Sequence, residues 1–328
     1  MNYDTFADSL TLPGQQVCDG EAFPLVLGCS NPAAPLEEIT ARIQTLRNDL
    51  DKQLKRYGAI LFRGFPVLTA EDFDAFVSAF SYPVFTFEES LSNAVRINVT
   101  PKVFTANEAP SSFRIMLHHE MAQTPHYPSR LFFFCEVSPS SGGATPVCRS
   151  DELFRRLQEE EPQFAGNCEA KGLQYSHVMP DEDNPQSGMG RSWRSTLSVD
   201  TQEAAEARLG KLNYTWNWEE EGGLRATTPV LPAVREIAPG RKSYFNQLIA
   251  FYAGRDPSKP SKEFNVTHGD GSPLDDRAAT HAVEIAESLT FDVPWQTSDV
   301  ALVDNYLVMH GRRPFEGSRR VLASLVAA

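Results

Sequence analysis

The sequence has little positive charge and no long apolar run. Its 30 Lys and Arg residues are outnumbered by 43 Asp and Glu residues, which gives a net charge of −13. Such a surface repels nucleic-acid phosphates and anionic membrane headgroups. No apolar run approaches the roughly 20 residues that span a bilayer, and the polar, acidic start Met1–Asp4 lacks the pattern of a secretory signal. We therefore expect a cytoplasmic protein that binds neither nucleic acid nor membranes.

Cysteine is scarce as well. The five cysteines are odd in number and none lies in a CxxC pair, so we expect free thiols and no disulfide framework. With 41% hydrophobic and 10% aromatic residues, the chain has enough apolar side chains for a sizeable core. No repeat or low-complexity linker interrupts it. We predict one domain over residues 1–328, with an irregular arm over 1–33 and a core from about residue 55 onward.

A candidate metal-binding pair stands at the end of a short apolar run. Residues 115–117 are Ile-Met-Leu, and they lead into His118, His119 and Glu120. Successive side chains of a strand point to opposite faces, so a strand here would place His118 and Glu120 on one face. With a third ligand, such a pair forms the two-His-one-carboxylate triad of non-haem Fe(II) oxygenases.

The spacing alone is weak evidence, because a second pair with the same spacing occurs. His268, Gly269 and Asp270 lie among turn-forming residues, with no strand to aim the side chains. With 7 histidines and 43 acidic residues in the chain, about one such pair is expected by chance. We therefore assign the metal pair to 118–120, where an apolar strand precedes it.

The C-terminal region offers the partners of this pair. His310 ends an apolar strand, as His118 does, and suits the third ligand; taken alone, a histidine in this position is more often a hydrogen-bonded core residue. Arg319 and Arg320 follow a hairpin-like turn at 316–318 and return along a neighbouring strand. Only one of two adjacent strand residues faces inward, where a guanidinium would suit a bidentate grip on a carboxylate.

Periodicity predicts a mainly β, α+β protein: a sandwich or jelly roll with helical cover. Strands are the more numerous elements, and the helices gather early and late in the chain. The residues 180–190 form a long polar loop, a candidate lid. The predicted helices are 35–57, 69–80, 150–157 with Ser150 as N-cap, and 273–289. The predicted strands are 25–27, 59–65, 95–103, 115–118, 130–137, 211–218, 243–248, 299–305, 306–310 and 321–326.

Four ordered motifs resemble the TauD/TfdA family of Fe(II)- and 2-oxoglutarate-dependent oxygenases. They are His118-His119-Glu120, the stretch Gly142-Gly143-Ala144-Thr145-Pro146, the stretch from Asp304-Asn305 to His310-Gly311-Arg312, and Pro314-Phe315-Glu316-Gly317-Ser318-Arg319-Arg320. Residues 61–65 and 245–247 extend the likeness, which covers most of the chain from about residue 55. Together, four motifs in order are far more specific than any one of them.

The resemblance implies a double-stranded β-helix core with flanking helices and iron between its sheets. It implies that His118, Glu120 and His310 are the iron ligands. It further implies that Thr145 helps to hold 2-oxoglutarate and that Arg320, with Arg319 as the second choice, binds the far carboxylate. The implied reaction converts 2-oxoglutarate and O₂ to succinate and CO₂ and abstracts hydrogen from a substrate C–H bond. Hydroxylation normally follows; desaturation or cyclisation can follow as well.

One ligand departs from the commonest family pattern. Many members have Asp where this chain has Glu120, and Glu is similar to the clavaminate-synthase-like and SyrP-like branch, which often acts on amino-acid-derived compounds in secondary metabolism. His119 stands where that branch commonly has Asn. Because a carboxylate ligand is present, a halogenase is disfavoured. We expect a small-molecule substrate, amino-acid-derived or another small metabolite, either free or tethered to a carrier protein.

Three residues are candidates for substrate contact. Arg114 precedes His118 by four residues, so a continuous strand would turn both to one face. Asn246 and Gln247 offer amides to polar substrate groups. The sequence determines neither the substrate and the carbon attacked nor the oligomeric state.

The sequence leaves two other functional interpretations open. A hydrolase or isomerase could hold Zn²⁺ on the same three ligands, although it would not need Thr145 and Arg320. The other interpretation is a jelly-roll binding protein without catalytic activity, but the intact triad argues against it.

Overall fold

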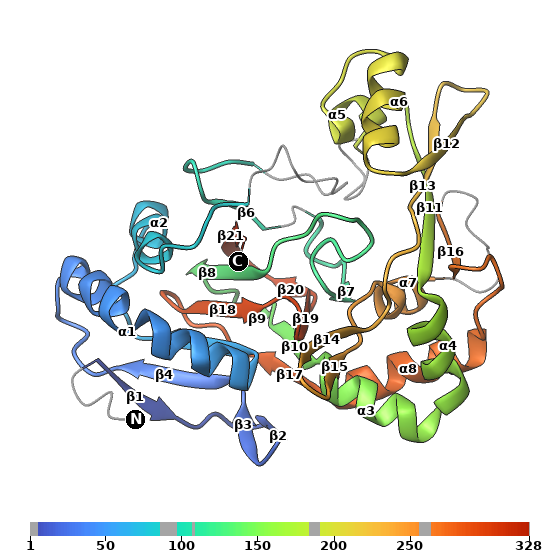
Figure 1. Cartoon of the computed structure of the whole chain (residues 1–328). Coiled ribbons are helices and arrows are strands. Elements are labelled where there is room, and N and C mark those ends of the chain that lie inside the picture. Colours follow the sequence, from blue (N-terminus) through green and yellow to red (C-terminus); the bar gives the residue numbers. More distant parts are fainter. Residues whose placement is uncertain (1–5, 86–96, 107–108, 184–190, 256–263, 328) are drawn as a thin grey trace.

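The structure is a computed structural model that describes residues 6–85, 97–106, 109–183, 191–255 and 264–327 (Figure 1). Its framework is a pair of β-sheets that face each other, with helices on both outer sides. This arrangement agrees with the predicted mainly β sandwich with helical cover. None of the helices in these ranges is long and apolar enough to cross a membrane.

The larger sheet has seven strands in the order β1-β4-β5-β18-β8-β21-β6. It is antiparallel except where β4 pairs with β5. Its strands are β1 (Ala7–Leu10), β4 (Leu25–Cys29), β5 (Ala59–Arg63), β18 (Val300–Asp304), β8 (Arg130–Val137), β21 (Arg320–Val326) and β6 (Phe104–Thr105).

The smaller sheet has four antiparallel strands in the order β17-β10-β19-β7. They are β17 (Thr290–Val293), β10 (Thr145–Arg149), β19 (Val308–Arg312) and β7 (Ile115–His118). Strands from the middle of the chain thus pair with strands near its end, which brings residues 115–118 beside residues 308–312.

Alternation along β21 shows how the core is divided. Val321, Ala323 and Leu325 pack between the two sheets, against residues such as Val147 of the smaller sheet. Leu322 belongs to the core on the other face of the larger sheet. Because side chains alternate in a strand, one sequence supplies two separate cores.

Helices α1 (Leu36–Tyr57) and α2 (Ala70–Ala79) cover the outer face of the larger sheet (Figure 1). Helix α1 ends at Gly58, which adopts the left-handed conformation with φ 83°. Thr69 caps α2 in a capping box with Asp72. The helix ends agree with the predicted ranges 35–57 and 69–80, because local hydrogen bonds and glycine freedom decide them.

Four helices cover the outer face of the smaller sheet, and their apolar faces pack around residues such as Cys148 and Met309. Helix α7 contacts β7 from this side. The helices are α3 (Ser150–Glu160), α4 (Pro162–Lys171), α7 (Leu248–Gly254) and α8 (Asp276–Ser288).

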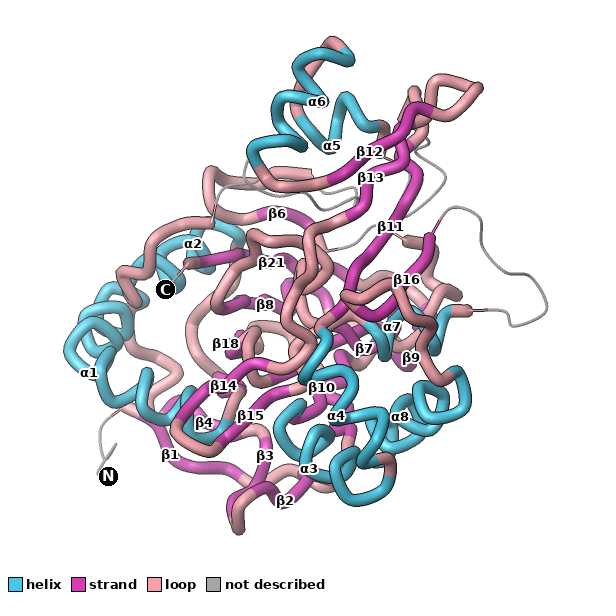
Figure 2. Tube along the Cα trace, turned by 45° about the vertical axis from the view of Figure 1, so that its right-hand side comes forward, coloured by secondary structure: helices cyan, strands magenta, loops and turns pink. Residues whose placement is uncertain are grey.

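A third sheet projects from one end of the molecule (Figures 1 and 2). Its strands are β12 (Thr215–Trp218), β13 (Leu224–Thr227), β11 (Leu173–Met179) and β16 (Phe264–His268), and it carries α5 (Trp193–Leu197) and α6 (Gln202–Lys211). Residues 173–183 and 191–228, here called the insert, have a small core of their own around Trp193 and Tyr214. Three two-stranded ribbons complete the fold: β2 (Gln16–Cys18) with β3 (Glu21–Phe23), β14 (Arg235–Ala238) with β15 (Arg241–Ser243), and β9 (Ser141–Gly142) with β20 (Phe315–Glu316).

Several element predictions were wrong. The predicted arm over residues 1–33 contains four strands within its described part, and two of them, β1 and β4, extend the larger sheet. The strand predicted over 95–103 lies at 104–105, and residues 95 and 96 fall outside the described residues. The strand predicted over 25–27 is β4, whereas β1, β2 and β3 were missed. Strand β6 pairs with β21, more than 200 residues later, which local periodicity could not show.

Three further predictions need correction near the insert and the smaller sheet. The strand predicted over 211–218 begins only at residue 215, because α6 extends to residue 211. No strand spans 243–248: β15 ends at Ser243 and α7 begins at Leu248. The predicted lid overlaps residues 184–190, which lie outside the described residues.

Candidate metal centre

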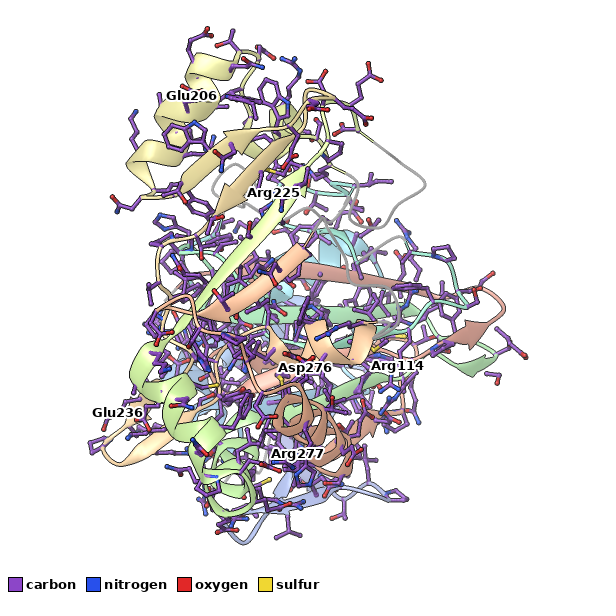
Figure 3. All side chains as sticks on the ribbon, turned by 90° about the vertical axis from the view of Figure 1, so that its right-hand side faces the viewer. Arg114, Glu206, Arg225, Glu236, Asp276 and Arg277 are labelled. Carbon is purple, nitrogen blue, oxygen red and sulfur yellow. The ribbon has the colours of Figure 1, made fainter. Side chains whose placement is uncertain are left out.

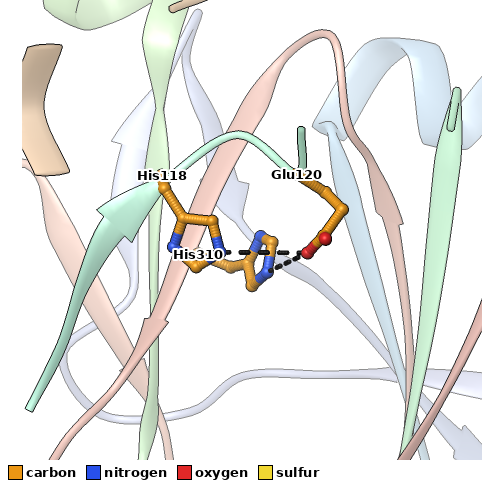
Figure 4. A group of neighbouring side chains, drawn as sticks. All are labelled: His118, Glu120 and His310. Carbon is orange, nitrogen blue, oxygen red and sulfur yellow. Dashed lines mark ion pairs between the residues drawn. The ribbon is translucent and has the colours of Figure 1, made fainter. Parts of the chain in front are cut away.

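His118, Glu120 and His310 meet at the edge of the smaller sheet (Figure 4). Strands β7 and β19 are neighbours, and His118 lies opposite His310 in their register. Strand β7 ends at His118, so Glu120 comes from the following turn. One ligand atom of each residue lies within 4.8 Å of the others. The pairing of two distant strands therefore assembles a group that the sequence only suggested.

The two imidazoles present their Nε2 atoms to the carboxylate. His118 donates from Nδ1 to the Met116 carbonyl at 2.8 Å, which leaves its Nε2 unprotonated when the ring is neutral. The distance from Glu120 Oε2 to Nε2 is 3.8 Å for His118 and 3.7 Å for His310 (Figure 4). Two neutral imidazole nitrogens and one carboxylate form the donor set of a non-haem Fe(II) site, so these residues fit the metal that the sequence implied.

Asn305 holds the backbone of Glu120 from both sides. Its Oδ1 accepts a hydrogen bond from the Glu120 amide at 2.8 Å, and its Nδ2 donates to the Glu120 carbonyl at 3.0 Å. A third bond runs from Nδ2 to the Pro128 carbonyl at 2.7 Å. Asn305 is completely buried, so water does not compete for these bonds.

His119 lies between two candidate ligands, and its side chain is buried in a polar network. Its Nδ1 donates to the Asn305 carbonyl at 2.5 Å, so its Nε2 accepts from the Ser150 hydroxyl at 2.7 Å. Burial lowers the pKa of His119 to about 3, and the ring is therefore neutral near pH 7. Ser150 was predicted to cap α3; its hydroxyl is bonded to His119 instead, and Arg149 occupies the N-cap position.

Two backbone features position the loop that carries the carboxylate. Met121 adopts a left-handed conformation with φ 60°, which is strained for a side chain with a Cβ. Gly311, next to His310, allows β7 and β19 to approach: a Cβ there would lie 2.5 Å from the Ile115 carbonyl oxygen. Glycine after His310 is thus needed for the spacing of the two histidines.

A second acidic group is a poor metal candidate. Asp19, Asp151 and Glu152 also place ligand atoms within 4.8 Å of one another. Arg149 and Arg241 both pair with Asp151, at 2.5 and 2.7 Å. The arginines neutralise the charge that would attract a cation, and Arg149 pairs with Asp19 as well.

Thr145 faces the space between the sheets on the same side as His310. In the register of β10 and β19, Val147 lies opposite His310, and Thr145 is two residues from Val147. Its hydroxyl oxygen accepts from Trp295 Nε1 at 2.9 Å. The hydroxyl hydrogen is therefore available to donate to an anion. The sequence analysis did not identify Trp295, because no local pattern links it to Thr145.

Of the two adjacent arginines, Arg319 points inward. Its Nε donates to the Gly143 carbonyl at 2.9 Å, and burial together with the charge of Arg312 lowers its pKa to about 10. Among the described residues, no carboxylate pairs with Arg319. A partly buried guanidinium without an acid is costly unless an anion is bound, so the remaining N–H groups of Arg319 mark a candidate carboxylate site.

Arg320 was the first choice for this role, and the structure corrects that choice. Its side chain is 48% exposed and pairs with Glu136 on the surface. The irregular pairing between Arg320 and Val321 places its extra residue in β8. Alternation back from Val321, Ala323 and Leu325, which face the space between the sheets, therefore selects Arg319. The choice of Arg320 came from the family resemblance alone.

The three predicted substrate residues have structural partners. Arg114 pairs with Glu287 of α8, on the outer side of the smaller sheet (Figure 3). An irregularity between β7 and β19 breaks the alternation that was expected to turn Arg114 with His118. The Asn246 side-chain amide bonds main-chain groups only: it donates to the Ala233 carbonyl and accepts from the Leu248 N–H. Gln247 donates to the His119 carbonyl at 2.7 Å and so supports the metal loop.

Comparison with known proteins agrees with this geometry. Residues 22–325 match the model of the taurine catabolism dioxygenase TauD, TfdA family. The chain belongs to this family. It is an Fe(II)- and 2-oxoglutarate-dependent oxygenase that acts on a small molecule, and O₂ is its second co-substrate.

Two curated proteins show the likeness over most of their length. A clavaminate synthase-like protein of Arabidopsis thaliana is 38% identical over 320 residues, covering 96% of both chains. The dapdiamide synthesis protein DdaC of Enterobacter agglomerans is 28% identical over 292 residues, covering 84% of both chains. The resemblance noted in the sequence, including its clavaminate-synthase-like branch, is confirmed.

Solved structures share the fold. PvcB of Pseudomonas aeruginosa has a TM-score of 0.55 at 14% identity, covering 98% of this chain and 91% of PvcB. A taurine dioxygenase of Burkholderia xenovorans has a TM-score of 0.55 at 15% identity, covering 98% of this chain and 90% of its own. The predicted jelly-roll fold class is therefore confirmed.

Proposed function

We propose that His118, Glu120 and His310 hold the iron as a facial triad. The convergence of these three side chains on one point carries this proposal. The Nδ1–H of His118 is fixed by the Met116 carbonyl, and the Glu120 backbone is fixed by Asn305. Partners of this kind orient metal ligands before the metal arrives.

Arg319 and Thr145 are the proposed 2-oxoglutarate contacts. Both lie beside the Gly142-Gly143 turn: Arg319 bonds the Gly143 carbonyl, and Thr145 follows two residues later. A Cβ at Gly143 would lie 3.0 Å from Arg319 Cδ, so glycine leaves the room that this arginine needs. The guanidinium supplies charge for the distal carboxylate, and the Thr145 hydroxyl supplies a further donor.

The division of labour in the reaction follows from these positions. Bound iron would supply the oxidative chemistry that couples decarboxylation of 2-oxoglutarate to attack on a C–H bond. The protein holds three ligands, grips the co-substrate through Arg319 and Thr145, and shields the site between two sheets. Phe133 of the larger sheet packs its ring 5.1 Å from that of His310 and helps to keep water away.

The proposed substrate is an amino-acid-derived small metabolite, free or carried on a carrier protein, and the proposed setting is secondary metabolism. One curated relative is a dapdiamide synthesis protein. Glu120 as the carboxylate ligand resembles the clavaminate-synthase-like branch, and this supports an amino-acid-derived substrate. Hydroxylation is the proposed outcome, because it needs no further protein group to divert the reaction.

We also propose that the chain forms one domain and works in the cytoplasm. The larger and smaller sheets share one core, which argues for a single folding unit. The five cysteines, all described, are free, and four of them are buried. Free thiols suit a reducing compartment.

The adjacent arginines allow a sharp test of the cofactor site. Apo-protein would be titrated anaerobically with Fe(II) and 2-oxoglutarate while the visible metal-to-ligand charge-transfer band is followed. We expect a band that needs both components and is absent in His310→Ala. Arg319→Ala should weaken 2-oxoglutarate binding at least tenfold, because a buried charged hydrogen-bond pair is lost.

Arg320→Ala is the matched control, since it removes the same side chain one residue away. It should change 2-oxoglutarate affinity by less than about twofold, as expected for an exposed ion pair. Equal effects of the two variants would contradict the assignment of Arg319. A band that survives in His310→Ala would contradict the triad.

A further inference from the structure

A cavity of about 40 Å³ lies between the metal loop and the insert. Gln123 and Thr124, which follow Glu120 in the chain, form one wall. The other walls come from β11, β13, β16 and the helices of the insert, and they include His177 and Tyr214. At roughly 10–15 Å³ for each water-sized group, the cavity has room for about three or four non-hydrogen atoms.

His177 and Tyr214 are polar side chains that line this cavity. His177 Nε2 is buried and makes no hydrogen bond within the described residues. Tyr214, which also lines the cavity, is only 6% exposed. A buried polar atom without a partner costs about 1–3 kcal/mol, so the His177 nitrogen at this cavity indicates that an occupant satisfies it.

The electrostatics of the cavity favour a neutral occupant. Burial, reinforced by the charge of Arg225, lowers the pKa of His177 to about 4, so the ring is neutral near pH 7. Arg225 already pairs with Glu219 in the insert (Figure 3). Burial alone raises the pKa of Tyr214 above its ordinary value. A charged group would lose hydration here without gaining a counter-ion.

The cavity is linked to the metal loop by hydrogen bonds. Gln247 Nε2 donates to Gln123 Oε1 at 2.9 Å and to the His119 carbonyl at 2.7 Å. Gln123 thus lies both in the wall of the cavity and in the network that fixes the residues beside Glu120. An occupant that touches Gln123 would lie next to the loop that carries the carboxylate ligand.

We infer that this cavity receives the distal end of the substrate, a short neutral group with a hydrogen-bonding heteroatom, such as a carboxamide or a hydroxyalkyl group. The inference rests on the proposed function, because it assigns the cavity to the substrate of the same iron site. His177 and Tyr214 would bond the heteroatom, while Met179 and Leu209 would contact the apolar part. The insert then determines how long the substrate can be.

Acetamide is the probe for a test, because it has four non-hydrogen atoms, no charge, and both a donor and an acceptor. It would be titrated into the metal-free full-length protein while the ring-proton NMR signal of His177 is followed. We expect a saturable shift with acetamide. Acetate, methylammonium and benzamide, which differ in charge or size, should give none at the same concentrations.

Ala226→Leu is the variant that fills the cavity. Ala226 lines it and lies opposite His177 in the register of β11 and β13, so a larger side chain would occupy the space beside the ring. Acetamide affinity should fall at least tenfold. Ala226→Val is a smaller alternative if the leucine variant does not fold. His268→Asn changes another buried histidine, on β16 opposite Leu173, and should leave the titration unchanged.

A second readout separates this inference from the proposed function. In the anaerobic Fe(II)–2-oxoglutarate complex, acetamide should shift the charge-transfer band of the wild-type protein and not that of Ala226→Leu. A band without any acetamide effect on His177 would overturn the inference and leave the proposed function standing. Binding to His177 that leaves the band unmoved would also overturn it. Absence of the band would refute the proposed function, whatever His177 shows.

Discussion

Asn305 brackets Glu120: its side-chain amide bonds both the N–H and the C=O of that one residue, at 2.8 and 3.0 Å. The two residues are 185 positions apart. Asn305 lies in the turn between β18 and β19, and β19 carries His310. The same hairpin therefore supplies one metal ligand and fixes the backbone of another.

This relationship predicts that Asn305→Ala weakens Fe(II) binding at least tenfold, as loss of outer-shell partners commonly does. It should also lower the free energy of unfolding by about 2–4 kcal/mol, because buried main-chain groups lose their partners. Anaerobic Fe(II) titration and urea unfolding would measure the two effects.

Asn246→Ala is the matched control for that experiment. Asn246 is an equally buried amide bonded to the main chain, but it bonds Ala233 and Leu248, away from Glu120. We expect a loss of stability with unchanged Fe(II) affinity. If Fe(II) affinity fell in both variants in proportion to the loss of stability, the Asn305 hydrogen bonds to Glu120 would have no specific role in metal binding.

Gly311→Ala should separate the two histidines. A Cβ at this position would lie 2.5 Å from the Ile115 carbonyl oxygen, so β7 and β19 would have to move apart. We expect about 2–4 kcal/mol of destabilisation and loss of the Fe(II)–2-oxoglutarate band. Gly166→Ala, in an exposed turn of α4 with open space around it, should instead be neutral or stabilise by up to about 1 kcal/mol. If Gly311→Ala bound Fe(II) with wild-type affinity, glycine at this position would not be needed for the spacing of His118 and His310.

Trp295→Phe tests the contact with Thr145. The ring stays, but the N–H that fixes the Thr145 hydroxyl at 2.9 Å is removed. One net hydrogen bond is worth about 0.5–1.5 kcal/mol, so 2-oxoglutarate affinity should fall about threefold to tenfold. Trp218→Phe, which removes a similar bond to Glu206 in the insert, should leave this affinity unchanged. The charge-transfer titration measures both.

Asp304→Asn should stabilise the protein at neutral pH. Burial raises the pKa of Asp304 from 3.8 to about 6, so the folded state binds the proton more tightly than the unfolded state. Its contribution to stability is therefore present below pH 3.8 and lost as the pH rises toward 6. The asparagine avoids this loss and can still accept from the Tyr306 amide.

The expected gain at pH 7.5 is at most about 3 kcal/mol, and it should vanish near pH 3.5. Thermal unfolding of both proteins at the two pH values would show it. Asp299→Asn is the contrasting variant, because Asp299 pairs with Arg63 at 2.7 Å and its charge is used. That variant should destabilise at pH 7.5. A pH-independent effect of Asp304→Asn would contradict the burial argument.

Local features of the fold were predictable from sequence. Thr69 and Gly58 bound their helices as expected, because caps depend on neighbours within four residues. The strands at 115–118 and 130–137 were also found, since apolar runs mark them. The strand predicted over 25–27 was found as β4, whereas the edge strand β1 and the turn at 244–247 were not predicted.

The sequence by itself determined the chemistry of this protein: the residue types His118, Glu120 and His310, the glycine turn before Thr145, and a pair of arginines in an order that marked the family. Only the tertiary structure decided orientation. Arg319 points inward and Arg320 outward, and Arg114 pairs with Glu287 of α8. Hydrogen bonds of Asn305, His119 and Ser150 fix the metal loop. Composition and order are local properties of a chain. The direction of a side chain depends on which face of a sheet its position presents and on local irregularities such as the one between β7 and β19, and pairing with distant strands decides both.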